Sequence, residues 1–205
     1  MNIKYGSTLK EFRTLYPVTF YIIAINTCTF IITVIFNWIY DDGYVQTSFG
    51  ITSGRYEPWR FITYAFLHNG IQHYLGNNLF LYIMTPPIEY ILGRRKFLIF
   101  ILINIVVTPM GDFLFWSTDS LVGSSGICFG IMAIYYYLMI SKRVVLSKQT
   151  VIILVIWSFL GWGSTFLMEH ISISGHITGF VWGILFSLMV FRKNESIHHS
   201  KSHMN

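Results

Sequence analysis

The sequence predicts an all-α, polytopic membrane protein, a bundle of six transmembrane helices, and two observations favour this fold class. Of the 205 residues, 54% are hydrophobic and only 11% are charged, whereas about a quarter of the residues in a soluble globular domain are charged. An aromatic share of 18% also excludes a disordered chain, because such chains carry little apolar surface. The second observation is that the apolar residues gather in six stretches.

Each of the six stretches is long enough, or nearly so, to cross a membrane. The hydrocarbon core of a bilayer is about 30 Å thick and takes about 20 apolar residues in a helix. The stretches are 17–40, 70–92, 97–116, 125–140, 150–168 and 175–192. They divide the chain into a short arm (1–16), a six-helix domain (17–192) and a polar tail (193–205) that is too short to fold alone.

Basic residues fall on alternate connections between these stretches. With six spans, both termini and the connections after the second and fourth spans lie on one side, and this side holds twelve of the fourteen lysines and arginines. Only Arg55 and Arg60 lie opposite. The positive-inside rule therefore predicts that both termini are cytoplasmic, with the protein in the plasma (inner) membrane. The net charge of +5 then requires no nucleic-acid partner.

The first outer connection, 41–67, is the longest of the connections. It holds Tyr44, Phe49 and Trp59, and aromatic residues of this kind are enriched at the boundary between lipid and water. We therefore expect this connection to rest on the outer membrane surface.

Polar side chains occur in the second stretch, where contact with lipid would be costly. The sequence FLHNGIQHYLGNNLF places histidines and amides at its outer end, and such residues normally face a protein interior or a water-filled cavity. On a helix, His73 and Asn77 share a face, whereas Asn78 is turned about 100° further. One face thus presents an imidazole and an amide together. The alternative is that these groups simply form hydrogen bonds between helices.

A serine opens the fourth stretch. A helix over 125–140 would be roughly 24 Å long at 1.5 Å per residue, so Ser125 is expected to lie below the outer surface. The free N–H groups and the positive dipole end of such a helix suit the oxyanion that develops in acyl transfer. The alternative is that Ser124 or Ser125 only caps the helix.

A histidine in the sixth stretch is placed to act with this serine. His176 lies at the outer end of that stretch, in the sequence GHITGFVWG. Small residues spaced as GxxxG let two helices approach closely, and such pairs are Gly126 and Gly130 in the fourth stretch and Gly179 and Gly183 in the sixth. Serine, histidine and helix amides together supply a nucleophile, a general base and oxyanion donors. Phe129, one turn after Ser125, could hold the imidazole by stacking.

Together these motifs resemble those of the rhomboid family of intramembrane serine proteases, and the resemblance extends over about 59–183. The motifs agree with the family in both order and spacing. The matching residues are the pair Trp59 and Arg60, the HxxxxHxxxN pattern of His68, His73 and Asn77, the GxSG pattern of Gly123 to Gly126, and the HxxGxxxG pattern of His176, Gly179 and Gly183.

The resemblance implies a serine endopeptidase that cleaves transmembrane segments of membrane-protein substrates within the lipid bilayer. Ser125 would be the nucleophile and His176 the general base, while His73, Asn77 and the Ser125 N–H would stabilise the oxyanion. Phe129 stands where the family commonly has tyrosine, so stacking on the imidazole is kept and the phenol is lost. The fifth span and the connection 169–174 would form the gate and cap. Neither a cofactor nor a metal is implied.

Two other functions are weighed against this one. A catalytically silent relative would bind membrane clients without cleaving them, although such proteins typically lack the serine or the histidine. A metal- or haem-binding protein would use His68, His73 and His176, because histidine is a common ligand of transition metals. His68 and His73, however, lie about 140° apart around a regular helix, which is a poor arrangement for one ion.

Overall fold

The computed structural model describes residues 5–52, 55, 57–114, 121–167 and 171–191, with only the backbone described at 112–114. Four residues of the predicted arm, the tail 193–205 and the part of the predicted cap at 169–170 lie outside this part of the chain. Regular structure in the described residues is helical, which confirms the all-α class. The elements are α1 (Leu9–Leu15), α2 (Pro17–Ile39), α3 (Tyr44–Phe49), α4 (Arg60–Thr63), the 3-10 turn η1 (Tyr64–Phe66), α5 (Gly70–Leu92), α6 (Arg94–Leu114), α7 (Ser125–Ile140), α8 (Lys148–Leu167) and α9 (Ile173–Val190).

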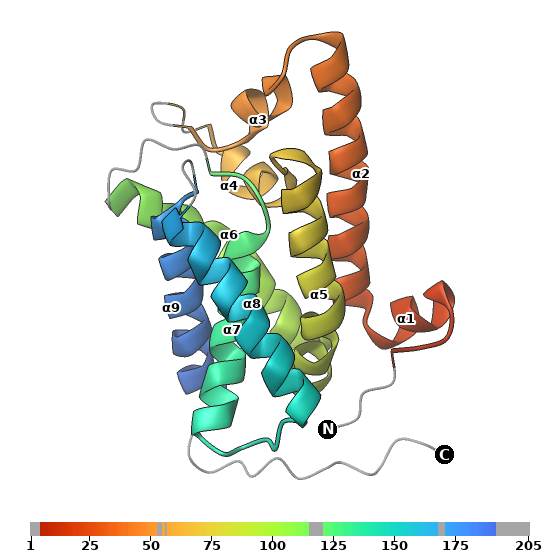
Figure 1. Ribbon diagram of the computed structural model, residues 1–205, viewed down its shortest axis with the longest axis vertical. Helices are drawn as coiled ribbons and strands as arrows, with labels where there is room; N and C mark the ends of the chain where they lie inside the picture. The colour runs from red at the N-terminus through yellow and green to blue at the C-terminus, as the bar shows by residue number, and fades with distance from the viewer. Residues whose placement is uncertain (1–4, 53–54, 56, 115–120, 168–170, 192–205) are drawn as a thin grey trace.

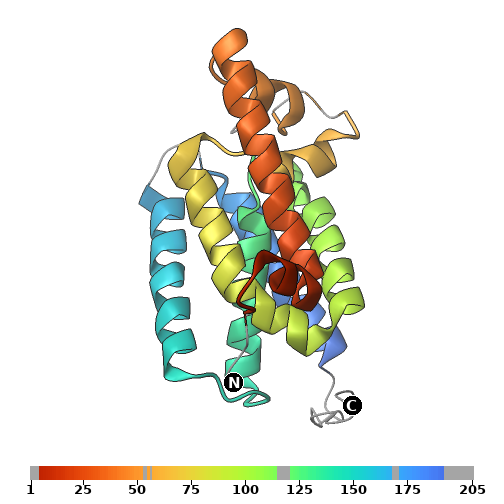
Figure 2. The same cartoon turned by 90° about the vertical axis from the view of Figure 1, so that its right-hand side faces the viewer.

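Each of the six apolar stretches forms one long helix, and these helices pack into one bundle (Figures 1 and 2). Among the described residues, α2, α8 and α9 are long and apolar enough to cross a membrane, and α7 is a shorter apolar helix. Helix α5 carries polar side chains among its apolar ones, and α6 begins with three basic residues. The count of six spans therefore stays a prediction.

The central position of α7 explains why a helix of only 16 residues suffices there. Most of its side chains are buried, and five of them have no exposed surface: Ile131, Ala133, Ile134, Tyr135 and Leu138. Because α7 packs against other helices rather than lipid, its length is not set by the bilayer. Its first turn lies well below the level of α3 in Figure 1, so α7 starts inside the bundle. The depth of Ser125 in a membrane stays a prediction.

A buried carboxylate joins the start of α2 to the last turns of α5. Glu89 of α5 is 2% exposed and accepts hydrogen bonds from the backbone N–H groups of Val18 (3.0 Å) and Thr19 (2.9 Å). These groups are the orphan donors at the start of a helix, and Pro17 ahead of them has no N–H to satisfy. Glu89 thus caps α2 from a neighbouring helix.

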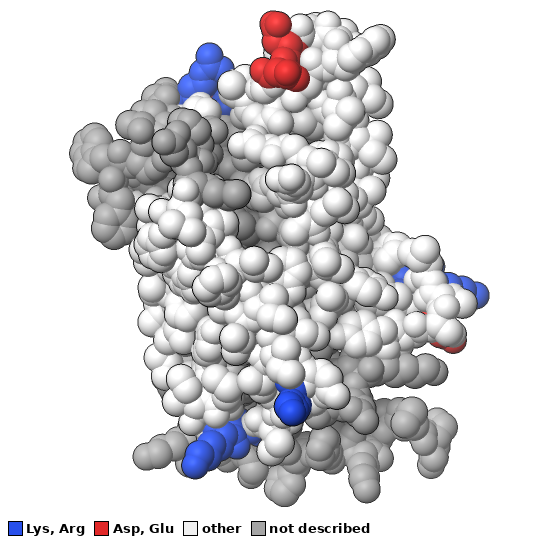
Figure 3. Space-filling model, viewed as in Figure 1, with Lys and Arg blue, Asp and Glu red and all other residues white. Residues whose placement is uncertain are grey.

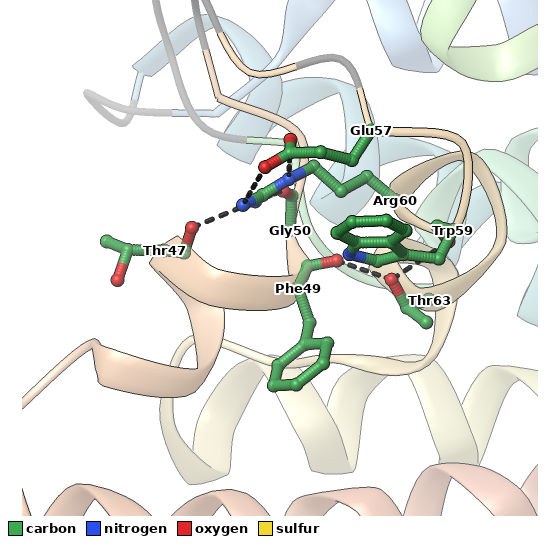
Figure 4. Close-up of polar contacts among 7 residues, drawn as sticks. All are labelled: Thr47, Phe49, Gly50, Glu57, Trp59, Arg60 and Thr63. Carbon is green, nitrogen blue, oxygen red and sulfur yellow. Dashed lines mark hydrogen bonds and ion pairs between the residues drawn. The ribbon is translucent and has the colours of Figure 1, made fainter.

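The outer connection contains α3, α4 and η1, short helices that were not predicted from the sequence. Arg60, which is 2% exposed, organises it by donating to the carbonyl oxygens of Thr47 and Gly50 and by pairing with Glu57 (Figure 4). Thr63 donates to the carbonyl of Phe49 (2.6 Å) and ties α4 to the end of α3 (Figure 4). The connection is a folded cap on this end of the bundle.

Charged side chains of the described residues gather toward the two ends of the face drawn in Figure 3 and at α1, and the surface between them is uncharged. The end that carries α3 shows both acidic and basic residues, and the opposite end shows lysines and arginines (Figure 3). That opposite end holds the connection 141–147 and the end of α9, and α1 lies toward it (Figures 1 and 2). The arrangement suits a molecule embedded in lipid.

Candidate active site

Ser125 and His176 meet where α7 and α9 begin. The Nε2 atom of His176 lies 2.9 Å from the Oγ atom of Ser125, a hydrogen-bond distance. The helices can approach this closely because both carry glycine: a Cβ atom on Gly179 would collide with the carbonyl oxygen of Gly126, and one on Gly183 would collide with that of Gly130. The predicted close approach of the two helices is therefore confirmed, and with it the contact between serine and histidine.

The imidazole of His176 is held on two further sides. Phe129 stacks on it, with 4.1 Å between the ring centroids and 16° between the planes. Trp162 of α8 meets the Phe129 ring edge-on at 4.7 Å. The Nδ1 atom of His176 lies 2.7 Å from the hydroxyl of Thr165, also on α8. The sequence predicted the Phe129 contact but missed Thr165, because a threonine in an apolar helix usually only bonds its own backbone.

Two side chains of α5 point toward the segment just before Ser125. A Cβ atom on Gly123 would lie 2.7 Å from Nε2 of His73 and 3.2 Å from Nδ2 of Asn77, so both nitrogens face this glycine. Gly123 also has a φ of +109°, which side-chain-bearing residues rarely adopt. Glycine is therefore required here for both backbone conformation and space.

Both nitrogens are available as donors. The Nδ1 atom of His73 accepts the backbone N–H of Asn69 (3.4 Å), so a neutral His73 carries its proton on Nε2. Asn77 is 8% exposed, and its Nδ2 has no partner among the described residues. The thiol of Cys128 lies 3.9 Å from the Oδ1 atom of Asn77 and favours the amide orientation that turns Nδ2 toward Gly123.

Neighbouring polar residues form hydrogen bonds between helices instead. Asn26 of α2 donates to Asn78 (3.2 Å) and to the hydroxyl of Ser124 (3.0 Å). Ser124 occupies the N-cap position of α7 but forms no side-chain capping bond, so the interpretation of Ser124 as a helix cap is wrong. His68 is fully buried and packs edge-on against His73, with 5.1 Å between the ring centroids.

A cavity of about 430 Å³ opens onto these groups. Its walls come from α5, α7, α8 and the segments before α7 and α9, and most of them are apolar, including Phe80, Met132 and Trp157. The polar groups that reach it include Ser125, His176, His73 and Asn77. A mostly apolar cleft with a few converging polar groups is the usual form of a binding site for an organic substrate.

Comparison with known proteins gives consistent matches. The family model named Rhomboid domain matches residues 55–193. YdcA of Bacillus subtilis (strain 168), whose name assigns it to the rhomboid proteases, is 25% identical over 196 residues, which cover 91% of this chain and 94% of YdcA. Rhomboid protease GluP of the same organism is 33% identical over 129 residues, or 62% of this chain and 25% of GluP. Rhomboid protease GlpG of Klebsiella pneumoniae is 24% identical over 134 residues, or 63% of this chain and 48% of GlpG.

Proposed function

The chain belongs to the rhomboid family, and on this premise we propose that it is an intramembrane serine endopeptidase that cleaves transmembrane segments of membrane-protein substrates. The observation that carries the proposal is the 2.9 Å contact between Ser125 and His176, buried inside a bundle of apolar helices. A serine–histidine pair on a cavity wall is the arrangement that activates a serine nucleophile.

In the proposed reaction, Ser125 is the nucleophile and His176 is the base. The Ser125 oxygen attacks the scissile carbonyl carbon while Nε2 of His176 takes the hydroxyl proton. The same nitrogen then returns that proton to the leaving amine as the C–N bond breaks. A water molecule, deprotonated by His176, hydrolyses the resulting acyl ester and restores the serine. Phe129 keeps the imidazole plane in place through both steps.

The carbonyl oxygen becomes an oxyanion in this reaction, and three donors support its stabilisation. They are Nε2 of His73, Nδ2 of Asn77 and the backbone N–H of Ser125 at the positive end of α7. The unsatisfied Nδ2 of Asn77 is the strongest sign of this role, because a buried donor without a partner is costly unless a ligand supplies one.

The proposal includes a membrane topology. All six long helices would cross the bilayer, with α5 and α6 carrying polar residues that face other helices, and both termini would lie in the cytoplasm of a cell whose plasma (inner) membrane holds the protein. The distribution of lysine and arginine supports this orientation. A substrate segment would reach Ser125 through the cavity between α5 and α8, where α8 would serve as the gate. No cofactor is needed for any step.

Covalent labelling with a fluorophosphonate tests the proposal without a known substrate. In detergent-solubilised protein we expect the probe to label the wild type and Ser124→Ala, and to label neither Ser125→Ala nor His176→Ala. Ser124→Ala is the matched control because it removes the adjacent hydroxyl, which bonds Asn26 rather than the histidine. Labelling that persists in Ser125→Ala would place the nucleophile elsewhere. A folded wild type that is never labelled would favour a silent, client-binding relative.

A further inference from the structure

We propose that Thr165 of α8 is a positioning residue that holds the proton of His176 on Nδ1 and thereby leaves Nε2 free to act as the base. This inference rests on the proposed protease function and extends it to a helix that carries neither the nucleophile nor the base. It is drawn from two hydrogen bonds that share the Thr165 hydroxyl.

The hydroxyl of Thr165 has one proton, and its position is determined by the nearest acceptor. Thr165 Oγ1 lies 2.6 Å from the backbone carbonyl oxygen of Gly161, one turn earlier in α8. A carbonyl oxygen only accepts, so the hydroxyl donates its proton in this bond. The Thr165 oxygen can then only accept from Nδ1 of His176, 2.7 Å away. Keeping both hydrogen bonds therefore requires a proton on Nδ1.

A neutral imidazole carries one proton, on either Nδ1 or Nε2. With Nδ1 protonated, Nε2 presents a lone pair to Ser125 at 2.9 Å and can accept the hydroxyl proton. With Nε2 protonated, the imidazole would instead donate to Ser125 and could not act as its base. The Thr165 oxygen favours the first form because only that form lets the hydroxyl keep its bond to the Gly161 carbonyl and bond Nδ1 at the same time.

The burial of the contact between Thr165 and His176 strengthens the preference for a proton on Nδ1. Thr165 is 1% exposed and His176 is 6% exposed, so water does not freely replace the threonine oxygen. A buried donor left without a partner is destabilising. Among the described residues of α8, only Leu154 and Thr165 are buried. One of the two buried residues of this helix is therefore the one that holds the histidine.

The direct test is the position of the proton on His176. In protein labelled with [15N]histidine, the cross-peaks between ring nitrogens and ring carbon-bound protons distinguish the two neutral forms, and His176→Ala assigns the signal. We expect the wild type and Thr165→Ser to show the proton on Nδ1. Thr165→Val, which keeps the shape but lacks the oxygen, should show a mixture or the form with the proton on Nε2. A wild type with the proton on Nε2 would overturn the proposal, whether or not any variant folds.

The second readout is the rate of fluorophosphonate labelling. Losing one net hydrogen bond shifts an equilibrium roughly tenfold, so we expect labelling of Thr165→Val to slow by about tenfold and Thr165→Ser to restore it. Ser158→Ala is the matched control: Ser158 also lies on α8 and donates to the carbonyl four residues earlier, but its oxygen accepts from Tyr136 rather than from His176. Its labelling rate should match the wild type.

The outcomes separate this inference from the protease proposal. A wild type that is not labelled defeats the protease proposal, and its histidine signal still tests Thr165. A wild type that is labelled, with Thr165→Val labelled at the same rate and still carrying its proton on Nδ1, defeats only the role of Thr165. Slow labelling in Ser158→Ala as well would show that any disturbed α8 has this effect, and would equally contradict a specific role.

Discussion

Helices α9 and α8 both flank the start of α7, yet they pack against it in opposite ways. Helix α9 lies so close to α7 that a methyl group on Gly179 would collide with the backbone of Gly126. Helix α8 buries only Leu154 and Thr165 among its described residues, and large apolar side chains such as Phe159 (78% exposed) face outward. The tight helix carries His176, and the loose helix carries the Thr165 contact to it.

This difference assigns different tasks to the two helices. Close packing of glycine-bearing helices leaves little freedom to slide, so the α7–α9 pair fixes the distance between Ser125 and His176. A helix with few buried contacts separates at lower cost, and α8 forms one wall of the cavity. In the proposed function, a substrate therefore enters beside α8 and leaves the 2.9 Å contact undisturbed.

The largest effect, on the rate of substrate cleavage, should come from Asn77 of α5, whose Nδ2 atom faces Gly123 just before α7. Asn77→Ala removes a proposed oxyanion donor, and loss of one such donor costs on the order of 10² in rate. We expect the rate of substrate cleavage, once a substrate is in hand, to fall by about that factor. Thermal stability should hardly change, because the Nδ2 atom has no partner among the described residues to lose.

Asn78→Ala is the matched control for this prediction. Asn78 bonds Asn26 and the carbonyl of Tyr74, so its removal should lower the melting temperature and leave the rate per folded molecule nearly unchanged. The opposite pattern in the two variants would show that Asn77 is a packing residue and that the oxyanion site lies elsewhere.

The next prediction concerns folding free energy and compares the same added methyl group on α9 and on α8. Gly179→Ala on α9 forces a Cβ atom against the backbone of Gly126, and overpacking of this kind costs about 1–3 kcal/mol of folding free energy. Gly163→Ala on α8 meets no described atom within 4 Å. It should be neutral or stabilise by up to about 1 kcal/mol, because alanine favours helix over glycine. Thermal unfolding in one detergent measures both.

Equal stability of Gly179→Ala and the wild type would contradict the tight interface. A large loss in Gly163→Ala would contradict the loose one. Either result would contradict the interpretation that α9 is held in place against α7 and that α8 separates from the bundle at lower cost.

The sequence predicted the tight region better than the loose one. Glycines spaced four apart on two apolar stretches indicate close approach, so the meeting of Ser125 and His176 could be expected from Gly126, Gly130, Gly179 and Gly183. All six long helices were located as well, because apolar length is a strong signal. The described boundaries differ from the predicted ones by three residues or fewer.

Contacts that depend on the relative rotation of two helices could not be predicted. Thr165 faces His176 rather than lipid only because of how α8 is turned about its axis. The sequence of this apolar helix has no periodicity that indicates this rotation. The pairing of Cys128 with Asn77 is hidden for the same reason. The helices α3 and α4 were missed because Arg60, a buried cation in the middle of the connection, organises them through backbone carbonyls.

The smallest effect on stability is expected in the outer connection, 41–67. There the ion pair between Glu57 and Arg60 acts locally, away from both α8 and α9. Its hydrogen bond with Arg60 lowers the pKa of Glu57 below the usual value of about 4.3. Because the folded-state pKa is the lower one, the unfolded chain takes up its proton first as the pH falls. The stability that the pair contributes is therefore complete above about pH 4.3 and is lost as the pH falls through the lowered pKa.

Glu57→Gln tests the pair, because it removes the charge and keeps the shape. At pH 7 the variant should melt slightly below the wild type, and the gap should narrow as the pH is taken below 4. The loss stays small because the Glu57 side chain is 38% exposed and Arg60 keeps its bonds to the carbonyl oxygens of Thr47 and Gly50. A gap that is absent at pH 7, or that widens in acid, would show that these carbonyl bonds alone hold the connection. Labelling of Ser125 should be unaffected throughout, since the pair touches neither the α7–α9 contact nor α8.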